Sequence, residues 1–158
     1  MQYRQFIRLL LKGAAAIGVS LDEQGSETLF SYFLELKRWS AKVNLVARET
    51  DDETIVEKHF VDSLALLSIL DADDRLFDIG TGAGFPGLVC KGARPELSVS
   101  LVEPRLKRVS FLRQVIRICK LEDVEVMACR LESGVGLAGE DECTMVTSRA
   151  VADIGKFL

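Results

Sequence analysis

Apolar residues in the first seventy positions recur at steps of three and four, which is the spacing of amphipathic helices. A pattern that begins at Leu9 and Leu10 predicts a first helix near the amino terminus. Two longer helical patterns follow it. Their expected apolar faces are Leu29, Phe33, Leu36 and Trp39 or Ser40 in the earlier helix, and Ile55, Phe60, Leu64 and Leu67 in the later one.

Each of the two longer helices is preceded by a capping box, in which a Ser or Thr and a Glu three residues later satisfy free backbone N–H groups. Ser20 with Glu23 predicts the start of the earlier helix, and Thr50 with Glu53 predicts the start of the later one. We expect Trp39 to lie in the core, because it follows the apolar face of its helix.

After residue 71 the pattern changes to short apolar runs that alternate with helical stretches. This alternation is typical of an α/β fold with a mostly parallel sheet and right-handed crossovers. We therefore predict a helical cap over residues 1–70 and an α/β core over residues 71–158, packed as one compact unit. The expected strands are RLFDIG, SVSLVE, VEVMAC and ECTMVTS, and the expected helices are PGLVCKGA, PRLKRVSFLRQVIRICKL and a last one that starts in AVADIGKFL.

The last residues, GKFL, stop within a helical pattern, directly after the fourth predicted strand. A sheet that ended there would leave a strand edge with unpaired hydrogen-bonding groups. Either the protein is unusually small for its architecture, or, as we expect, the sequence is a truncated form that lacks the last strands of its sheet. We expect a monomer, with a dimer through the open edge as the alternative.

Composition restricts the class of protein. With 158 residues, 48% of them hydrophobic, the chain is long enough for one domain with a substantial core. It contains no apolar run of the ~20 residues that a membrane helix needs, and Arg8 and Lys12 interrupt the only early apolar stretch. We expect a cytoplasmic protein with no membrane partner. Its four cysteines lack the close spacing of a zinc site or a disulfide framework, so no metal is expected.

The segment FDIGTGAGFPG, residues 77–87, contains four glycines and joins a predicted strand to a predicted helix. Loops of this kind hold ligands at the carboxyl ends of parallel strands. The segment satisfies the dinucleotide pattern GxGxxG, and Glu103 lies where that fold places its ribose-binding carboxylate. It also satisfies the pattern of an acid followed by three spaced glycines, typical of methyltransferases that use S-adenosylmethionine (SAM).

Charge favours SAM over a dinucleotide. A pyrophosphate requires helix N–H groups with no carboxylate nearby, whereas this loop follows Asp78 and includes Pro86, which lacks an N–H. SAM carries an ammonium and a sulfonium, which an acid stabilises. The carboxylate of Glu103, at the end of the second strand, can accept both ribose hydroxyls. The residues themselves thus predict a SAM site that includes Asp78, Gly82, Gly84 and Glu103.

A basic helix follows the second strand. The net charge of −4 excludes a generally basic nucleic-acid binder, so any RNA contact requires a local patch. Beside a SAM site, Arg105, Lys107 and Arg108 are candidates for contacts with phosphate groups, although a solvated helix face would show the same pattern.

Several segments together resemble the bacterial small-subunit rRNA guanine-N7 methyltransferases, the RsmG or GidB family. The loop DIGTGAGFPG carries the resemblance, and its phenylalanine–proline–glycine end is distinctive within methyltransferases. The resemblance covers essentially the whole chain, although the family usually continues for some tens of residues past TSRAVA. The other segments that agree are KRWSAKVNLVA, KHFVDSLALL, VEPRLKRVSFLR and TSRAVA.

The resemblance implies a Rossmann-like class I SAM-dependent methyltransferase fold, with SAM as cofactor. It implies methylation of a guanine N7 in 16S rRNA, as naked RNA or in the small ribosomal subunit. Arg149, after the fourth strand, would lie where the target base enters and would also contact RNA. By position, the implied SAM contacts are Gly80, Phe85, Leu131, Glu132 and Arg149.

Guanine N7 has a free lone pair and no proton, so it can attack the SAM methyl group directly, in line with the leaving sulfur. No general base is required, and we assign no catalytic residue. His59, the only histidine, is expected to be structural, with Asp62 and Ser63 on the same turn as possible contributors to the pocket. The alternatives are an NAD-dependent oxidoreductase and a truncated SAM-binding fragment without activity.

Overall fold

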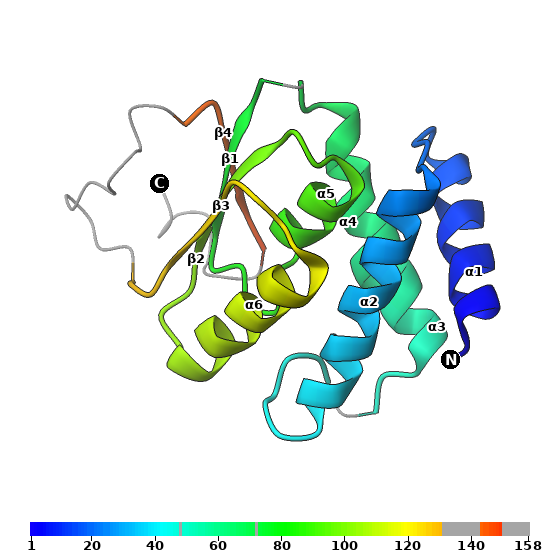
Figure 1. The fold of residues 1–158 in the computed structure, drawn as a ribbon, viewed down its shortest axis with the longest axis horizontal. Coiled ribbons are helices and arrows are strands. Elements are labelled where there is room, and N and C mark those ends of the chain that lie inside the picture. Colours follow the sequence, from blue (N-terminus) through cyan, green and yellow to red (C-terminus); the bar gives the residue numbers. More distant parts are fainter. Residues whose placement is uncertain (48, 72, 131–142, 150–158) are drawn as a thin grey trace.

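A four-stranded sheet forms the centre of the computed structural model, which describes residues 1–47, 49–71, 73–130 and 143–149 (Figure 1). The strands lie in the order β3-β2-β1-β4, and all three pairings are parallel, as the sequence predicted. Phe77 in the middle of β1 pairs with Ser100 of β2 on one side and with Val146 of β4 on the other. The strands are β1 Arg75–Ile79, β2 Ser98–Val102, β3 Val124–Met127 and β4 Met145–Ser148.

The strand order reverses between β1 and β4, because the chain moves from β1 to β2 and β3 and then returns to the other side of β1. In α/β proteins the crevice at such a reversal, at the carboxyl ends of the strands, is the usual ligand site. The strand order alone therefore predicts a ligand site between the loops after β1 and β4.

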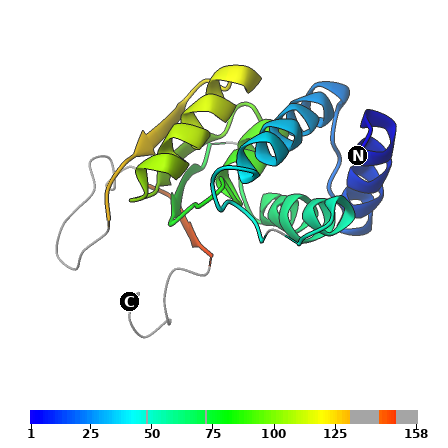
Figure 2. The same ribbon diagram turned by 90° about the horizontal axis from the view of Figure 1, so that it is seen from below.

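The helices that the structure describes lie on one face of this sheet (Figures 1 and 2). Two of them, α5 (Gly87–Ala93) and α6 (Leu106–Cys119), cover the sheet directly and follow β1 and β2. Against these packs α2 (Glu23–Ser40), and α1 (Tyr3–Ala16) lies farthest from the sheet. The predicted helix in AVADIGKFL lies outside the described residues.

The helical segment before the sheet is irregular. It runs through α3 (Asp52–Ile55), the π-helix η1 (Val56–Val61), α4 (Asp62–Leu64) and the 3₁₀-helix η2 (Ala65–Ser68). The predicted apolar face is buried, and its steps shorten in the same order. Ile55 to Phe60 is a step of five residues, Phe60 to Leu64 a step of four, and Leu64 to Leu67 a step of three. These are the hydrogen-bond spacings of π, α and 3₁₀ helices, so the core positions account for the change of helix type.

Both predicted capping boxes are wrong by one or two residues. Asp22, not Ser20, caps α2, and its carboxylate accepts a hydrogen bond from the Gly25 N–H at 2.7 Å. Asp51, not Thr50, caps α3 and accepts from the Thr54 N–H at 2.9 Å. An aspartate next to the expected cap competes for the same free N–H groups, and its charge is stabilised by the helix dipole.

A cluster of aromatic side chains connects the cap helices to the loop after β1. The Phe60 ring contacts the rings of Phe6, Tyr32 and Phe85, at centroid distances of 5.6, 5.2 and 5.5 Å. Phe6, Tyr32 and Phe60 are at most 1% exposed. The same hydrophobic cluster therefore contains residues of the helical segment and of the candidate ligand loop.

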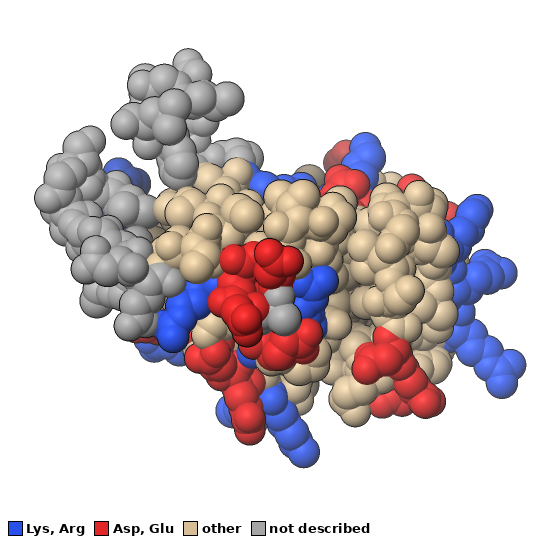
Figure 3. All heavy atoms as spheres, turned by 90° about the horizontal axis from the view of Figure 1, so that it is seen from above, with Lys and Arg blue, Asp and Glu red and all other residues tan. Residues whose placement is uncertain are grey.

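The sheet's amino-terminal end is acidic, as the view from above Figure 1 shows (Figure 3). Asp71 and Asp73 lie exposed in the turn before β1. The negative net charge is thus partly located at the end opposite the ligand loop. All four cysteines are free thiols. In the described part of the chain, no helix is both long and apolar enough to cross a membrane.

Candidate ligand site at the carboxyl ends of the strands

The loop after β1 has the unusual backbone that its glycines predicted. Gly80, Gly82 and Gly84 have φ angles of +69°, +62° and +94°, a region that residues with a Cβ rarely adopt. The N–H groups of Gly80 and Thr81 donate to the Val102 carbonyl at 2.8 and 3.2 Å, which fixes the loop to the end of β2. The backbone is therefore attached to the end of β2. Gly80 and Gly82 are partly exposed and carry no side chain, whereas Gly84 is buried.

Asp78 lies beneath this loop and is 0% exposed. Its Oδ2 accepts hydrogen bonds from the Thr81 hydroxyl at 2.6 Å and from the Gly87 N–H at 2.9 Å, which connects both ends of the loop. Its Oδ1 is buried and has no hydrogen-bond partner among the described residues. This geometry does not favour the predicted direct contact of Asp78 with a ligand, because the carboxylate is buried. Asp78 instead holds the two ends of the loop together and places a negative charge beneath it.

Burial raises the pKa of Asp78 to about 6, although the hydrogen bonds from Thr81 and Gly87 lower it. An unfolded aspartate titrates near 3.8, so the folded state binds the extra proton between these two values. The resulting stability is fully present below pH ~4 and is lost as the pH rises through about 6. We expect wild type, relative to Asp78→Asn, to become less stable between pH 4.5 and 7.5, by on the order of 1 kcal/mol per pH unit at the steepest point.

Urea denaturation of both proteins across this pH range measures the effect. The difference between the two isolates Asp78, because other carboxylates titrate alike in wild type and variant. An identical pH dependence of the two unfolding free energies would show that the buried carboxylate does not titrate in this range.

Glu103 lies at the end of β2 and is 2% exposed. Its Oε2 accepts from the Gly82 N–H at 3.1 Å, and its Oε1 accepts from the Arg105 N–H at 2.9 Å. An ionised carboxylate has about four acceptor positions, so Oε1 retains one for a ligand, whereas Oε2 also faces the Arg108 guanidinium. The structure therefore brings Glu103 and the central glycine of the loop together, as the sequence predicted.

Arg108 is engaged inside the site. Its Nη1 lies 3.7 Å from Glu103 Oε2, and its Nη2 donates to the Asn44 carbonyl at 3.1 Å. This side chain is only 23% exposed, so it connects the loop after α2 to the Glu103 carboxylate. The prediction that Arg108 contacts phosphate groups competes with this internal role. Lys107 is exposed on the same helix, and Arg105 is exposed directly before it.

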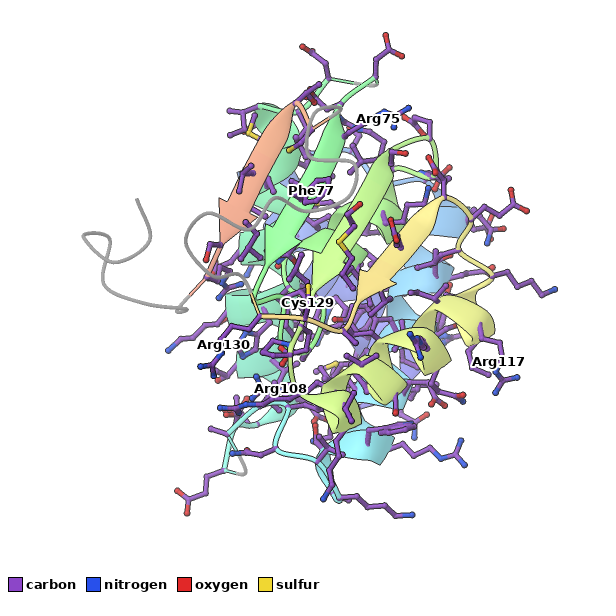
Figure 4. All side chains as sticks on the ribbon, turned by 90° about the vertical axis from the view of Figure 1, so that its left-hand side faces the viewer. Arg75, Phe77, Arg108, Arg117, Cys129 and Arg130 are labelled. Carbon is purple, nitrogen blue, oxygen red and sulfur yellow. The ribbon has the colours of Figure 1, made fainter. Side chains whose placement is uncertain are left out.

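Figure 4 shows Arg108 with Cys129 and Arg130 at the end toward which the strands point, and Arg75 at the other end. Arg130 follows β3 and is exposed. It adds a cation to the carboxyl edge of the sheet that the sequence pattern did not single out. Leu131 and Glu132 lie outside the described residues.

His59 and Phe85 stack on each other, with ring centroids 5.0 Å apart and an interplanar angle of 21°. Burial lowers the pKa of His59, the nearby Arg149 cation lowers it further, and Asp62 opposes both. A neutral ring packed on Phe85 fits the structural role that the sequence suggested. His59 lies on the π-helix η1. The only sequence signal for this π-helix is the five-residue step from Ile55 to Phe60 between buried positions.

Arg149 follows β4 and is exposed, and its Nη2 donates to the Lys58 carbonyl at 3.4 Å. With Thr147 of β4 and Pro86 at the end of the glycine loop, it lines a cavity of about 320 Å³. The cavity lies at the reversal of strand order, and its other walls come from α4 and η2. Sequence reasoning missed Thr81 and Tyr32, which hold the loop from below; Tyr32 donates a hydrogen bond to the Ala83 carbonyl.

The groups that could ligate a metal do not cluster: within the described ranges, no three His, Cys, Asp or Glu side chains lie close enough to hold an ion. Among the described residues, the site can therefore bind a ligand through hydrogen-bond acceptors, loop backbone, and both negatively and positively charged side chains.

Comparison with known proteins places the chain in one family. The family model described as "rRNA small subunit methyltransferase G" (GidB) matches residues 26–158. A ribosomal RNA small subunit methyltransferase G of Desulfotalea psychrophila is 53% identical over 153 residues, which are 97% of this chain and 70% of that protein. Another, from Roseiflexus sp. (strain RS-1), is 46% identical over 92% of this chain and 63% of that protein.

The chain thus spans 70% of the length of the first relative and 63% of the length of the second. Among solved structures, it is similar to a putative protein-L-isoaspartate O-methyltransferase from Plasmodium falciparum in complex with S-adenosyl-L-homocysteine. That similarity has a TM-score of 0.49 at 15% identity, over 84% of this chain and 66% of the other.

Proposed function

Because the chain belongs to the rRNA small subunit methyltransferase G family, we propose that it transfers the methyl group of SAM to N7 of a guanine in 16S rRNA. The observation that carries this proposal is the position of Glu103 directly beside Gly82 in a loop of three glycines with positive φ. A carboxylate with spare acceptor positions next to bare backbone is the arrangement that the ribose of an adenosyl cofactor requires.

The residues present fit SAM. Glu103 would accept the ribose hydroxyls, and Gly80 and Gly82 would allow the cofactor to approach the backbone closely. The predicted contact of Gly84 with SAM would use its backbone only, because the place of its missing side chain is filled by Tyr32 and Leu88. Asp78 keeps a buried oxygen without a hydrogen-bond partner in the described structure, and its negative charge favours a cationic ligand over a pyrophosphate. When bound, SAM supplies an electrophilic methyl group on a sulfonium.

The chain's own contribution to the reaction is alignment. Guanine N7 is an acceptor without a proton, so no residue has to remove one before the attack. Holding N7, the methyl group and the sulfur in line and excluding water is worth several kcal/mol of barrier. The Phe85 ring, packed between His59, Tyr32 and Phe60, fixes the end of the glycine loop for this purpose.

The RNA would approach the carboxyl edge of the sheet, opposite the acidic turn before β1. Among the described residues, the exposed cations that we assign to this edge are Arg105 directly before α6, Lys107 on α6, Arg130 after β3 and Arg149 after β4. Phosphate contacts by such side chains would make binding weaken steeply with salt. Arg108 would act instead through Glu103 and the Asn44 carbonyl. An rRNA substrate implies a cytoplasmic location.

The test has two parts. In calorimetric titrations we expect the chain to bind S-adenosylhomocysteine (SAH), the product of SAM, and not NAD. With radiolabelled SAM and small ribosomal subunits that lack the modification, we expect label in 7-methylguanine after digestion to nucleosides. Binding of NAD without SAH would overturn the cofactor assignment, and label in any other nucleoside would overturn the guanine N7 assignment.

A further inference from the structure

Three cations follow one side of α1, the helix that lies farthest from the sheet. Arg4, Arg8 and Lys12 are spaced by four residues, which places them in a row about 12 Å long on one side of an α-helix. All three residues are exposed. Figure 3 shows Lys and Arg side chains that project from the edge of the molecule that α1 forms. We call this row the basic face of α1.

The basic face has no counter-charge within the described ranges. Residues 1–21 contain these three cations and no Asp or Glu, although the whole chain has a net charge of −4. Among the described residues, none of the three cations has a hydrogen-bond or ion-pair partner for its side chain. The adjacent acids have other partners. Asp52 pairs with Lys37 at 2.7 Å, and Glu53 accepts a hydrogen bond from Gln5 at 3.0 Å.

This arrangement is unfavourable for the helix itself. Like charges four residues apart repel each other on a helix surface. Arg4 lies in the first turn of α1, where the helix dipole disfavours a positive charge, and that turn contains no acid to compensate. A helix face that is merely solvated gains stability from charges of both signs at this spacing. Helix stability therefore does not account for the basic face, whereas an anionic partner outside the protein does.

We propose that the basic face of α1 binds the phosphate backbone of rRNA, away from the segment that carries the target guanine. The inference rests on the proposed function, because it gives the same substrate a second contact surface. The three charges lie in a row along a helix and do not converge on one point, so they fit an extended polyanion better than a single phosphate group. Contacts of this kind position a nucleic acid without reading its bases.

The position of α1 allows one RNA to reach both surfaces. The N-terminus, where α1 begins, lies toward the same end of the molecule as the carboxyl ends of the strands (Figure 1). The helices α2, α5 and α6 separate α1 from the sheet (Figure 2). A cofactor bound at the glycine loop is too short to cross these layers, whereas a folded rRNA can extend from the glycine loop around the helical cap to α1.

An anionic membrane surface is the competing partner. Tyr3 and Leu11 are 41% and 40% exposed on the same helix, and a helix that binds a membrane interface combines such apolar side chains with cations. That mode of binding, however, requires a free apolar face. In α1 the apolar face is buried in the core through Phe6, Leu10 and Ala14, which are at most 1% exposed. For this reason we favour RNA.

The experiment compares wild type with two triple variants that change the net charge equally. The test variant removes the basic face and is Arg4→Gln, Arg8→Gln, Lys12→Gln. The matched variant removes exposed cations from the second half and the end of α6, which runs from the end of β2 toward the start of β3 and thus away from the carboxyl edge. The helix dipole accounts for cations at this end of a helix. The matched variant is Arg113→Gln, Arg117→Gln, Lys120→Gln.

Filter binding to small ribosomal subunits that lack the modification is measured over a series of salt concentrations. We expect the test variant to bind the subunits about ten-fold more weakly than wild type, and the matched variant to change by less than about two-fold. The slope of log affinity against log salt should become shallower by about 2 in the test variant, because each lost phosphate contact contributes about 0.7–0.9.

The test variant should also keep the wild-type SAH affinity and kcat while its KM for subunits rises, and its melting temperature should not fall, since repelling charges are removed. Wild-type subunit affinity in the test variant, or an equal loss in both variants, would overturn this inference alone. So would binding to phosphatidylserine vesicles that requires the basic face while subunit binding does not. Absence of subunit binding by wild type would overturn the proposed function together with the inference.

Discussion

Replacing Glu103 with glutamine is expected to weaken SAH binding about 100-fold. The carboxylate already accepts the N–H groups of Gly82 and Arg105, one on each oxygen. A glutamine has a single oxygen, so its amide nitrogen would face one of these N–H groups and would no longer accept from the adjoining ribose hydroxyl. Hydrogen bonds to a charged acceptor contribute about 1.5–3 kcal/mol each, and 1.4 kcal/mol corresponds to a factor of ten.

Calorimetric titration of SAH measures this loss, with Glu125→Gln as the control. Glu125 lies exposed on β3, so its variant has the same change in net charge without touching the loop. Because the Glu103 carboxylate also fixes the loop, the unfolding free energy of the free protein should fall by only about 1–2 kcal/mol, as for one lost backbone contact. A variant with unchanged SAH affinity would mean that Glu103 accepts hydrogen bonds from the backbone only and does not bind the ligand.

The fold was predictable because its signals are local. Each strand is a short apolar run bounded by turn residues, and each covering helix has a continuous apolar face, so the α/β alternation and the parallel sheet followed directly. The positive φ angles of Gly80, Gly82 and Gly84 were likewise implied by glycine itself, since few other residues adopt them.

Other features could not be predicted because they depend on partners distant in sequence. Arg108 belongs to a basic helix, and only the folded chain shows that Asn44 and Glu103 occupy its guanidinium. The position of Asp78 before the glycines is typical of a carboxylate that contacts a ligand, but in the structure Thr81 and Gly87 donate hydrogen bonds to it from within the loop. The capping boxes failed for a local reason: Asp22 and Asp51 compete with the Ser and Thr that lie two residues and one residue before them.

Replacing Gly84 with alanine is expected to destabilise the protein by about 2–5 kcal/mol. Its φ of +94° costs a residue with a Cβ about 1–2 kcal/mol. A Cβ at this position would also lie 2.7 Å from Leu88 Cδ1 and 2.8 Å from the Tyr32 hydroxyl, both closer than real contacts allow. Overpacking of a buried site costs about a further 1–3 kcal/mol, because the tightly packed neighbours cannot move aside freely.

Gly18→Ala separates the two contributions. Gly18 has a similar φ of +73° in the turn after α1, but no atom lies within 4 Å of the position that its Cβ would take, so this variant should lose only the conformational part. Urea denaturation of both variants gives the difference, which measures the steric cost alone. Tyr32 also packs on Phe85 and Phe60, so a displacement of Tyr32 by the new methyl group would also disturb the packing of the aromatic cluster. Equal losses in the two variants would mean that the loop can move away from Tyr32, and that the cap helices do not fix its shape.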